Sequence, residues 1–72
     1  MPIDEILKSI RKELGISQEA LARDLNVSFA ALNRWENKKS KPSRMAMMLI
    51  KDYCKQKDIS VQITGELDKI RV

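Results

Sequence analysis

A chain of 72 residues, with 14 basic and 10 acidic side chains and a net charge of +4 at pH 7, has room for one small domain with a thin core. It has no histidine, only one cysteine (Cys54) and no glycine-rich phosphate loop, which argues against an internal disulfide and against most nucleophilic or phosphoryl chemistry. No apolar run approaches the ~18 residues of a membrane span, so we expect a cytoplasmic protein without a membrane segment. From the residue types we also expect that it is not an enzyme and uses no metal ion or cofactor.

The first predicted element is an amphipathic helix. Its apolar residues recur at three- and four-residue spacing, which places them on one helical face. They are Ile3, Ile6, Leu7, Ile10 and Leu14. Asp4 and Glu5 belong to the first turn, where the helix dipole favours negative charge. Gly15 can take the left-handed conformation that ends a helix, so we expect the helix to end there.

Two further helices are predicted from a starting signal that occurs twice. At residues 16–17 and again at 27–28, an apolar residue precedes a serine that can cap the free amides of a helix. Asn26 tolerates the left-handed conformation, so the earlier helix should end near Leu25. The predicted inner faces are Leu21, Ala22 and Leu25 in the earlier helix and Ala31, Leu32 and Trp35 in the later one.

A fourth helix is predicted after the polar segment 37–42, because Pro42 disfavours helical structure just before it. Ser43 can cap this helix, which should end among residues 55–57. Its predicted buried stripe consists of Met45, Met48, Leu49 and Tyr53, widened by Ala46, Ile50 and Cys54. Met47 falls outside that stripe and is the better candidate for contact with a dimer partner or another protein.

Residues 58–72 have a different pattern. Ile59, Val61 and Ile63 alternate with polar residues, which predicts a strand, and a turn at 64–66 could return a second strand at 70–72. Because a lone hairpin is marginal in water, this tail should pack on the bundle, pair with another chain or stay disordered. The expected architecture is thus an all-α four-helix bundle over residues 1–57, followed by a tail over 58–72 that is a candidate dimerisation element.

Two helices joined by about three residues, with the small residue Ala22 at their crossing, are typical of a helix-turn-helix. One polar and six apolar residues stand at the spacing of a known family: Gln18, Leu21, Ala22, Leu25, Val27, Leu32 and Trp35. Three strings are similar to that family too: Ser17-Gln18-Glu19, Arg34-Trp35-Glu36-Asn37 and Lys41-Pro42-Ser43. From about Ile3 to Tyr53 the chain resembles the Cro and phage-repressor (Xre) family of bacterial regulators, which implies a lambda-repressor-like helical bundle.

The chain departs from the family at two positions where glycine is usual. Asn26 is a tolerable replacement, because asparagine visits the left-handed region readily. Lys38 would either carry a small strain there or indicate a different exit from the third helix.

The resemblance also implies roles for individual residues. Those placed to face bases in the major groove are Ser28, Phe29, Ala30, Asn33 and Arg34. Those placed to meet phosphates are Gln18, Lys38, Lys39, Lys41 and Arg44, the last of which approaches the minor groove in some members. Arg11 and Glu36 match a structural ion pair between the first and third helices, so neither is a predicted DNA contact.

The chemistry of these residue types agrees with the implied roles. Arg34 can donate two hydrogen bonds to guanine, Asn33 can pair with adenine, and Phe29 can touch a thymine methyl group. Two alternatives stay open: Phe29 could fold back as core, and the lysines of the loop could simply be solvated. Five cations between Arg34 and Arg44 against one acid favour phosphate contact.

The predicted function is a double-stranded DNA-binding transcriptional regulator, acting by repression or by recruitment of polymerase. One such domain reads about four to five base pairs, which is too few for a genome, so we expect a homodimer. The alternative is an antitoxin-like or adaptor module in which the helix-turn-helix and the tail bind a protein partner. An Arg34→Ala change would spare function in that alternative, whereas truncation of the tail would abolish it.

Overall fold

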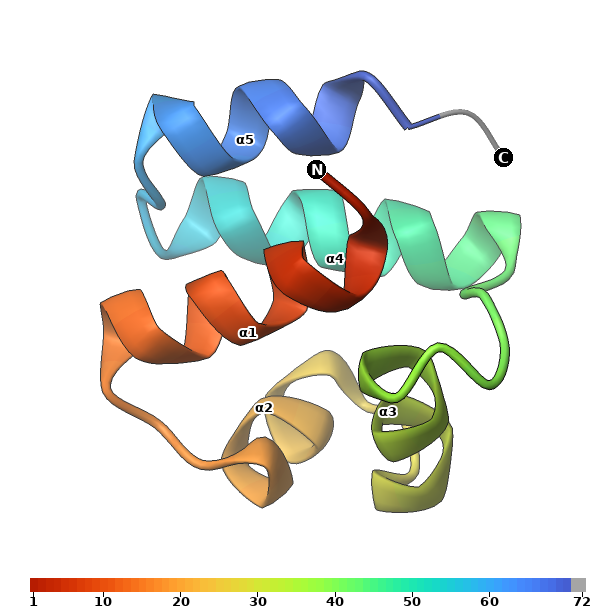
Figure 1. The fold of residues 1–72 in the computed structure, drawn as a ribbon. Helices are drawn as coiled ribbons and strands as arrows, with labels where there is room; N and C mark the ends of the chain where they lie inside the picture. The colour runs from red at the N-terminus through yellow and green to blue at the C-terminus, as the bar shows by residue number, and fades with distance from the viewer. Residues whose placement is uncertain (71–72) are drawn as a thin grey trace.

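The computed structural model describes residues 1–70, and within them the protein is all-helical, as predicted, but with five helices in place of four. They are α1 (Ile3–Leu14), α2 (Gln18–Leu25), α3 (Phe29–Glu36), α4 (Arg44–Gln56) and α5 (Val61–Asp68). Figure 1 shows α2 and α3 together on one side of the molecule and α5 on the opposite side, with α1 and α4 running between them. Arg71 and Val72, the end of the predicted hairpin, lie outside the described residues.

Three helices start where the serines predict. The hydroxyl of Ser17 accepts a hydrogen bond from the Ala20 amide at 3.1 Å, and Ser28 and Ser43 do the same for the amides three residues on, at 3.0 and 3.2 Å. Each cap satisfies one of the amides that a helix start leaves without a partner. The starts of α2, α3 and α4 are therefore fixed by local chemistry, as predicted.

The ends of α1 and α2 also follow the prediction. Gly15 has a φ of 66° and Asn26 a φ of 61°, both in the left-handed region, and each closes the helix before it with backbone hydrogen bonds. Side chains from α1, α2 and α3 meet in one core with those of α4 and α5. Its fully buried members include Ile6, Leu7, Ile10, Leu21, Leu32, Ile50 and Leu67.

The predicted buried face of α4 is right for Ala46, Ile50, Tyr53 and Cys54 but wrong for the methionines and Leu49. Met45, Met48 and Leu49 are exposed by 74, 64 and 42 %, whereas Met47 is 2 % exposed. The buried residues of α4 are Ala46, Met47, Ile50, Tyr53 and Cys54. Residues 45–50 are all apolar, so helical spacing allows more than one inward stripe, and contacts with α2 and α5 select the one around Ile50.

The predicted strand after residue 58 is wrong as well, because the chain forms α5 there. Ile59 and Leu67 are buried, and Ile63 and Ile70 pack against the core, so the apolar residues follow a helical spacing of four, four and three. Val61, which a strand would have buried with Ile59, is 83 % exposed. Residues 59–70 thus pack on the bundle, in contact with α1 and α4. A dimerisation role for the tail stays a prediction.

A hydrogen bond ties the start of α5 to α1, and a buried thiol lies on the neighbouring helix α4. The backbone amide of Ser60 donates a hydrogen bond to Glu13 on α1 at 2.9 Å, so α5 begins tied to the end of α1. Cys54 is 1 % exposed, and burial, reinforced by the nearby carboxylates of Glu13 and Asp68, raises the pKa of its thiol to about 11. The thiol is therefore a protonated core group at neutral pH and a poor nucleophile.

The packing of α5 generates a stability prediction. Leu67→Ala should lower the free energy of unfolding by about 2–4 kcal/mol, since it removes a side chain that is 1 % exposed and leaves a cavity. Val61→Ala, on the same helix but 83 % exposed, should change it by less than about 0.5 kcal/mol. Urea denaturation followed by far-ultraviolet circular dichroism measures both. Equal effects of the two substitutions would contradict the placement of α5 in the core.

Candidate DNA interface

The pair α2 and α3 forms a tight unit around the turn at residues 26–28. The Val27 amide donates a hydrogen bond to the Ala22 carbonyl at 3.0 Å, which closes the turn on the last part of α2. Ala22 is 3 % exposed, and α3 packs against both α1 and α2. A larger side chain at position 22 would separate the two helices.

One face of α3 is buried and the other is open. Leu32, Trp35 and Glu36 are buried, whereas the side chains at 29, 30 and 34 are exposed. Phe29 has 49 % of its surface exposed, so its ring is not part of the core, and the alternative that it folds back as core is wrong. Asn33 is half-buried, and its Oδ1 accepts a hydrogen bond from Nδ2 of Asn37 at 3.0 Å, which leaves the Asn33 amide group free to donate.

An ion pair fixes α3 to α1. Arg11 donates from Nε to Oε2 of Glu36 at 3.0 Å and from Nη2 to Oε1 at 2.6 Å, so the guanidinium holds both carboxylate oxygens. The Glu36 side chain is 2 % exposed and that of Arg11 is 26 % exposed. This bidentate geometry restricts rotation of α3 about its own axis, and it keeps Glu36 away from the open face.

A second polar contact, which the sequence did not reveal, joins α2 to α4. The Tyr53 hydroxyl donates a hydrogen bond to Oδ2 of Asp24 at 3.0 Å. Burial, together with this hydrogen bond to a carboxylate, raises the pKa of Tyr53 to about 12. The partners are 29 residues apart in the chain, so no local pattern could have paired them.

The loop after α3 is cationic and exposed. Lys38, Lys39 and Lys41 are all exposed, and so is Arg44 in the first turn of α4. Among residues 1–70, none of these four cations forms an ion pair. Gln18 is half-buried at the first position of α2, where a helix has free amides. Lys38 has a φ of 62°, so the left-handed exit from α3 is kept although the residue there is not glycine.

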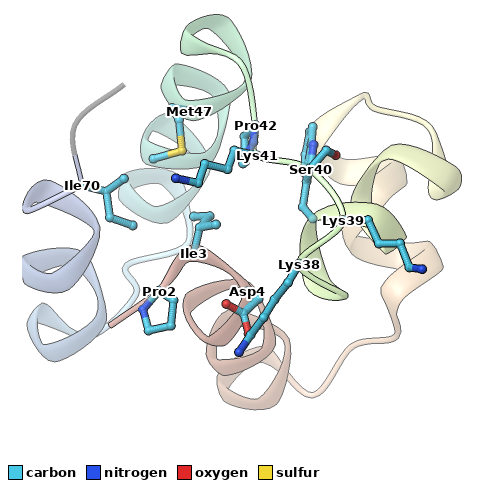
Figure 2. Close-up of a pocket in the computed structure, with 11 residues that line it drawn as sticks. Pro2, Ile3, Asp4, Lys38, Lys39, Ser40, Lys41, Pro42, Met47 and Ile70 are labelled. Atoms are coloured by element: carbon cyan, nitrogen blue, oxygen red, sulfur yellow. The ribbon is translucent and has the colours of Figure 1, made fainter.

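The loop borders a cavity of about 570 Å³. Figure 2 shows Lys38 extending toward Asp4 and Lys41 extending toward Met47 across this cavity, with Ile3 between them, whereas the Lys39 side chain points away. Trp35 and the buried Asp4 also line it. The lysines of the loop are therefore exposed beside a hollow and are not enclosed by the core.

A short helix that is held against another by its inner face and bordered by a cationic loop is the arrangement of a helix-turn-helix DNA-binding protein. A family model for the helix-turn-helix matches residues 7–55, which run from the second turn of α1 nearly to the end of α4. The chain therefore belongs to the Cro/C1-type, Xre-like family of helix-turn-helix regulators, as its motifs predicted. The family binds DNA, and its members are typically not enzymes.

Searches of curated proteins and of solved structures give no significant match. The five helices within residues 1–70 include no candidate for a membrane span. The family thus establishes DNA binding in general, while the roles of the individual side chains remain predictions that the geometry can support.

The Arg11–Glu36 pair generates the second stability prediction. Arg11→Met should cost about 3 kcal/mol, because it leaves a carboxylate that is 2 % exposed without its partner. The matched control Lys12→Met removes an exposed cation from the same helix and should cost less than about 0.5 kcal/mol. The double variant Arg11→Met with Glu36→Leu should recover most of the loss, since no buried charge remains. The midpoints of urea denaturation measure these differences. Equal midpoints for Arg11→Met and Lys12→Met would contradict a structural role of the Arg11–Glu36 pair.

The backbone of Lys38 generates the third prediction. Lys38→Gly should raise the free energy of unfolding by about 0.5 kcal/mol, because glycine adopts a positive φ without strain, and this gain outweighs its greater freedom in the unfolded chain. Lys39→Gly removes the same charge from a position without a positive φ and should lower stability by about 0.5 kcal/mol. Thermal unfolding of both variants at one ionic strength is the measurement. Effects of the same sign would show that the left-handed exit carries no strain.

Proposed function

We propose that the protein is a sequence-specific regulator of transcription that reads double-stranded DNA by placing α3 in the major groove. The side chains that would contact base edges are Ser28, Phe29, Ala30, Asn33 and Arg34. Those that would contact phosphates are Gln18, Lys38, Lys39, Lys41 and Arg44. In this arrangement the phosphate contacts set the register on the duplex and the base contacts discriminate among sequences.

The observation that carries the proposal is the division of α3 into two faces. Its inner face is fully engaged by Leu32, Trp35 and the ion pair of Glu36, so α3 is held rigidly while its outer face has no partner within residues 1–70. The outer face presents an aromatic ring and a guanidinium, which suit a thymine methyl group and a guanine edge.

Electrostatics support the same orientation. The segment 34–44 holds five cations and one acid, and that acid is Glu36, whose charge is buried against Arg11. The surface that this segment exposes is therefore purely cationic, next to the open face of α3. A polyanion would be attracted to this side of the molecule with a strong dependence on salt.

Specific binding requires two copies of the domain. The Cα atoms of the protein span 27 × 26 × 18 Å, which is shorter than the ~34 Å between equivalent major-groove faces one helical turn apart. One copy therefore reads one half-site. We infer a homodimer on a two-fold symmetric operator, where binding blocks or recruits polymerase.

Two substitutions test this function. After selection of a preferred duplex from a random library, Arg34→Ala should weaken binding to that duplex by about 1–3 kcal/mol and relax the preference at one base pair. Lys39→Ala, which removes a predicted phosphate contact, should weaken binding to all duplexes alike and reduce the slope of log affinity against log salt by about one. Fluorescence anisotropy at two salt concentrations measures both effects.

If the unmodified protein binds duplexes without sequence preference, and Arg34→Ala leaves affinity and salt slope unchanged, the open face of α3 does not read DNA. The helix-turn-helix would then serve as a surface for a protein partner.

A further inference from the structure

The outward side of α4 carries a cluster of apolar side chains that the proposed base and phosphate contacts do not use. Met45, Met48 and Leu49 are exposed by 74, 64 and 42 %, and their spacing of three and one places them on one face of the helix. We call these three residues the α4 patch. They line a shallow hollow together with Lys51, Asp52 and Lys55.

The α4 patch differs from the other exposed apolar residues of the described chain. Met1, Phe29 and Val61 are also exposed, but each stands in a different part of the molecule. The patch gathers three such side chains on one helix, whose opposite face already packs on α2 and α5. Contiguous apolar surface of this kind marks an interaction site in a small protein, and methionine adapts readily to a facing surface.

We propose that the α4 patch is the contact between two copies of this chain, with the two α4 helices antiparallel and Met48 next to the two-fold axis. The proposal rests on the proposed function, which requires two copies on one operator. It commits to a second copy because a two-fold contact must be self-complementary, and the placement of Arg44 and Asp52 on either side of Met48 has that property.

The self-complementarity lies in the charges beside the patch. Arg44 and Asp52 are both exposed and lie four residues before and after Met48, which is about 6 Å along the helix on either side. An antiparallel pair of helices centred on Met48 places Arg44 of one copy beside Asp52 of the other, twice. A parallel pair would place each charge beside its own equivalent, which is repulsive.

The arrangement of the helices selects the same geometry. Figure 1 shows α4 crossing the molecule between α5 on one side and the α2–α3 pair on the other. A two-fold axis that is perpendicular to α4 and runs from α5 toward α2 and α3 keeps both copies of α3 on the same side. An axis along α4 would turn one copy of α3 away, so only the antiparallel pair can present both to one duplex.

The first test measures the oligomeric state of the full chain without DNA. Sedimentation equilibrium should find a dimer for the unmodified protein, and Met48→Asp should weaken its association at least tenfold by placing two carboxylates at the axis. Val61→Asp adds the same charge at an exposed apolar position on α5 and should leave the dimer intact. Circular dichroism confirms that both variants are folded, which their exposure favours. A monomeric unmodified protein, or equal effects of the two variants, would overturn the proposal.

The second test addresses the antiparallel register. Arg44→Asp and Asp52→Arg should each weaken the dimer, whereas the two changes together should restore it, because the cross-copy pairs are reformed with exchanged signs. These variants are compared without DNA, since Arg44 is also a predicted phosphate contact. A double variant that associates no better than the single variants would overturn the proposed register.

Binding to DNA separates failure of this inference from failure of the proposed function. On a duplex with one half-site, Met48→Asp should bind like the unmodified protein, and on a duplex with two half-sites it should lose the cooperative gain. If Met48→Asp retains that gain, the interface is wrong although the protein reads DNA. If the unmodified protein is a dimer that Met48→Asp dissociates, yet it binds no duplex specifically, the interface stands and the proposed function fails.

Discussion

The arrangement of this protein depends on the buried carboxylate of Glu36. At 2 % exposure it needs a partner, and Arg11 on α1, 25 residues earlier in the chain, supplies two hydrogen bonds. A helix of eight residues such as α3 is marginal on its own, so its orientation has to come from tertiary contacts. Leu32 and Trp35 supply the apolar part of those contacts, while the ion pair adds direction, because a bidentate pair tolerates little rotation.

This constraint has an electrostatic consequence at the surface. Because the charge of Glu36 is buried and paired with Arg11, the segment that leaves α3 exposes only cations among its charged side chains. The same interaction thus orients the outer face of α3 and removes the one negative charge that would weaken the attraction of a polyanion. The cost is that position 36 cannot lose its partner without burying an unpaired charge, so stability and the proposed function share one contact.

Local chemistry made most of the helix-turn-helix predictable from the sequence. The serine caps, the left-handed Gly15 and Asn26, and the inner faces of α2 and α3 follow from residue types and short spacings, and the structure confirms them. Contacts between distant residues were not predictable in this way. Asp24 and Tyr53 meet only because α2 and α4 cross, and Arg11 was paired with Glu36 through a family resemblance rather than through a local pattern.

The two errors of the sequence interpretation have one physical origin. In both places the apolar residues fit two patterns at once. Ile59, Val61 and Ile63 alternate as in a strand, but Ile63 also begins a series with Leu67 and Ile70 that has helical spacing. The helix that forms there packs on α1 and α4, with Ile59 and Leu67 beside Cys54.

The inward face of α4 is ambiguous for the same reason. Residues 45–50 are all apolar, so several faces of the helix could be buried, and the contacts of α4 with α2 and α5 determine which residues lie inside. Met47 and Ile50 take the interior, and Met45, Met48 and Leu49 are left on the surface. The contacts of α5 and α2 with α4 therefore set the rotation of α4 and, with it, the exposure of the α4 patch.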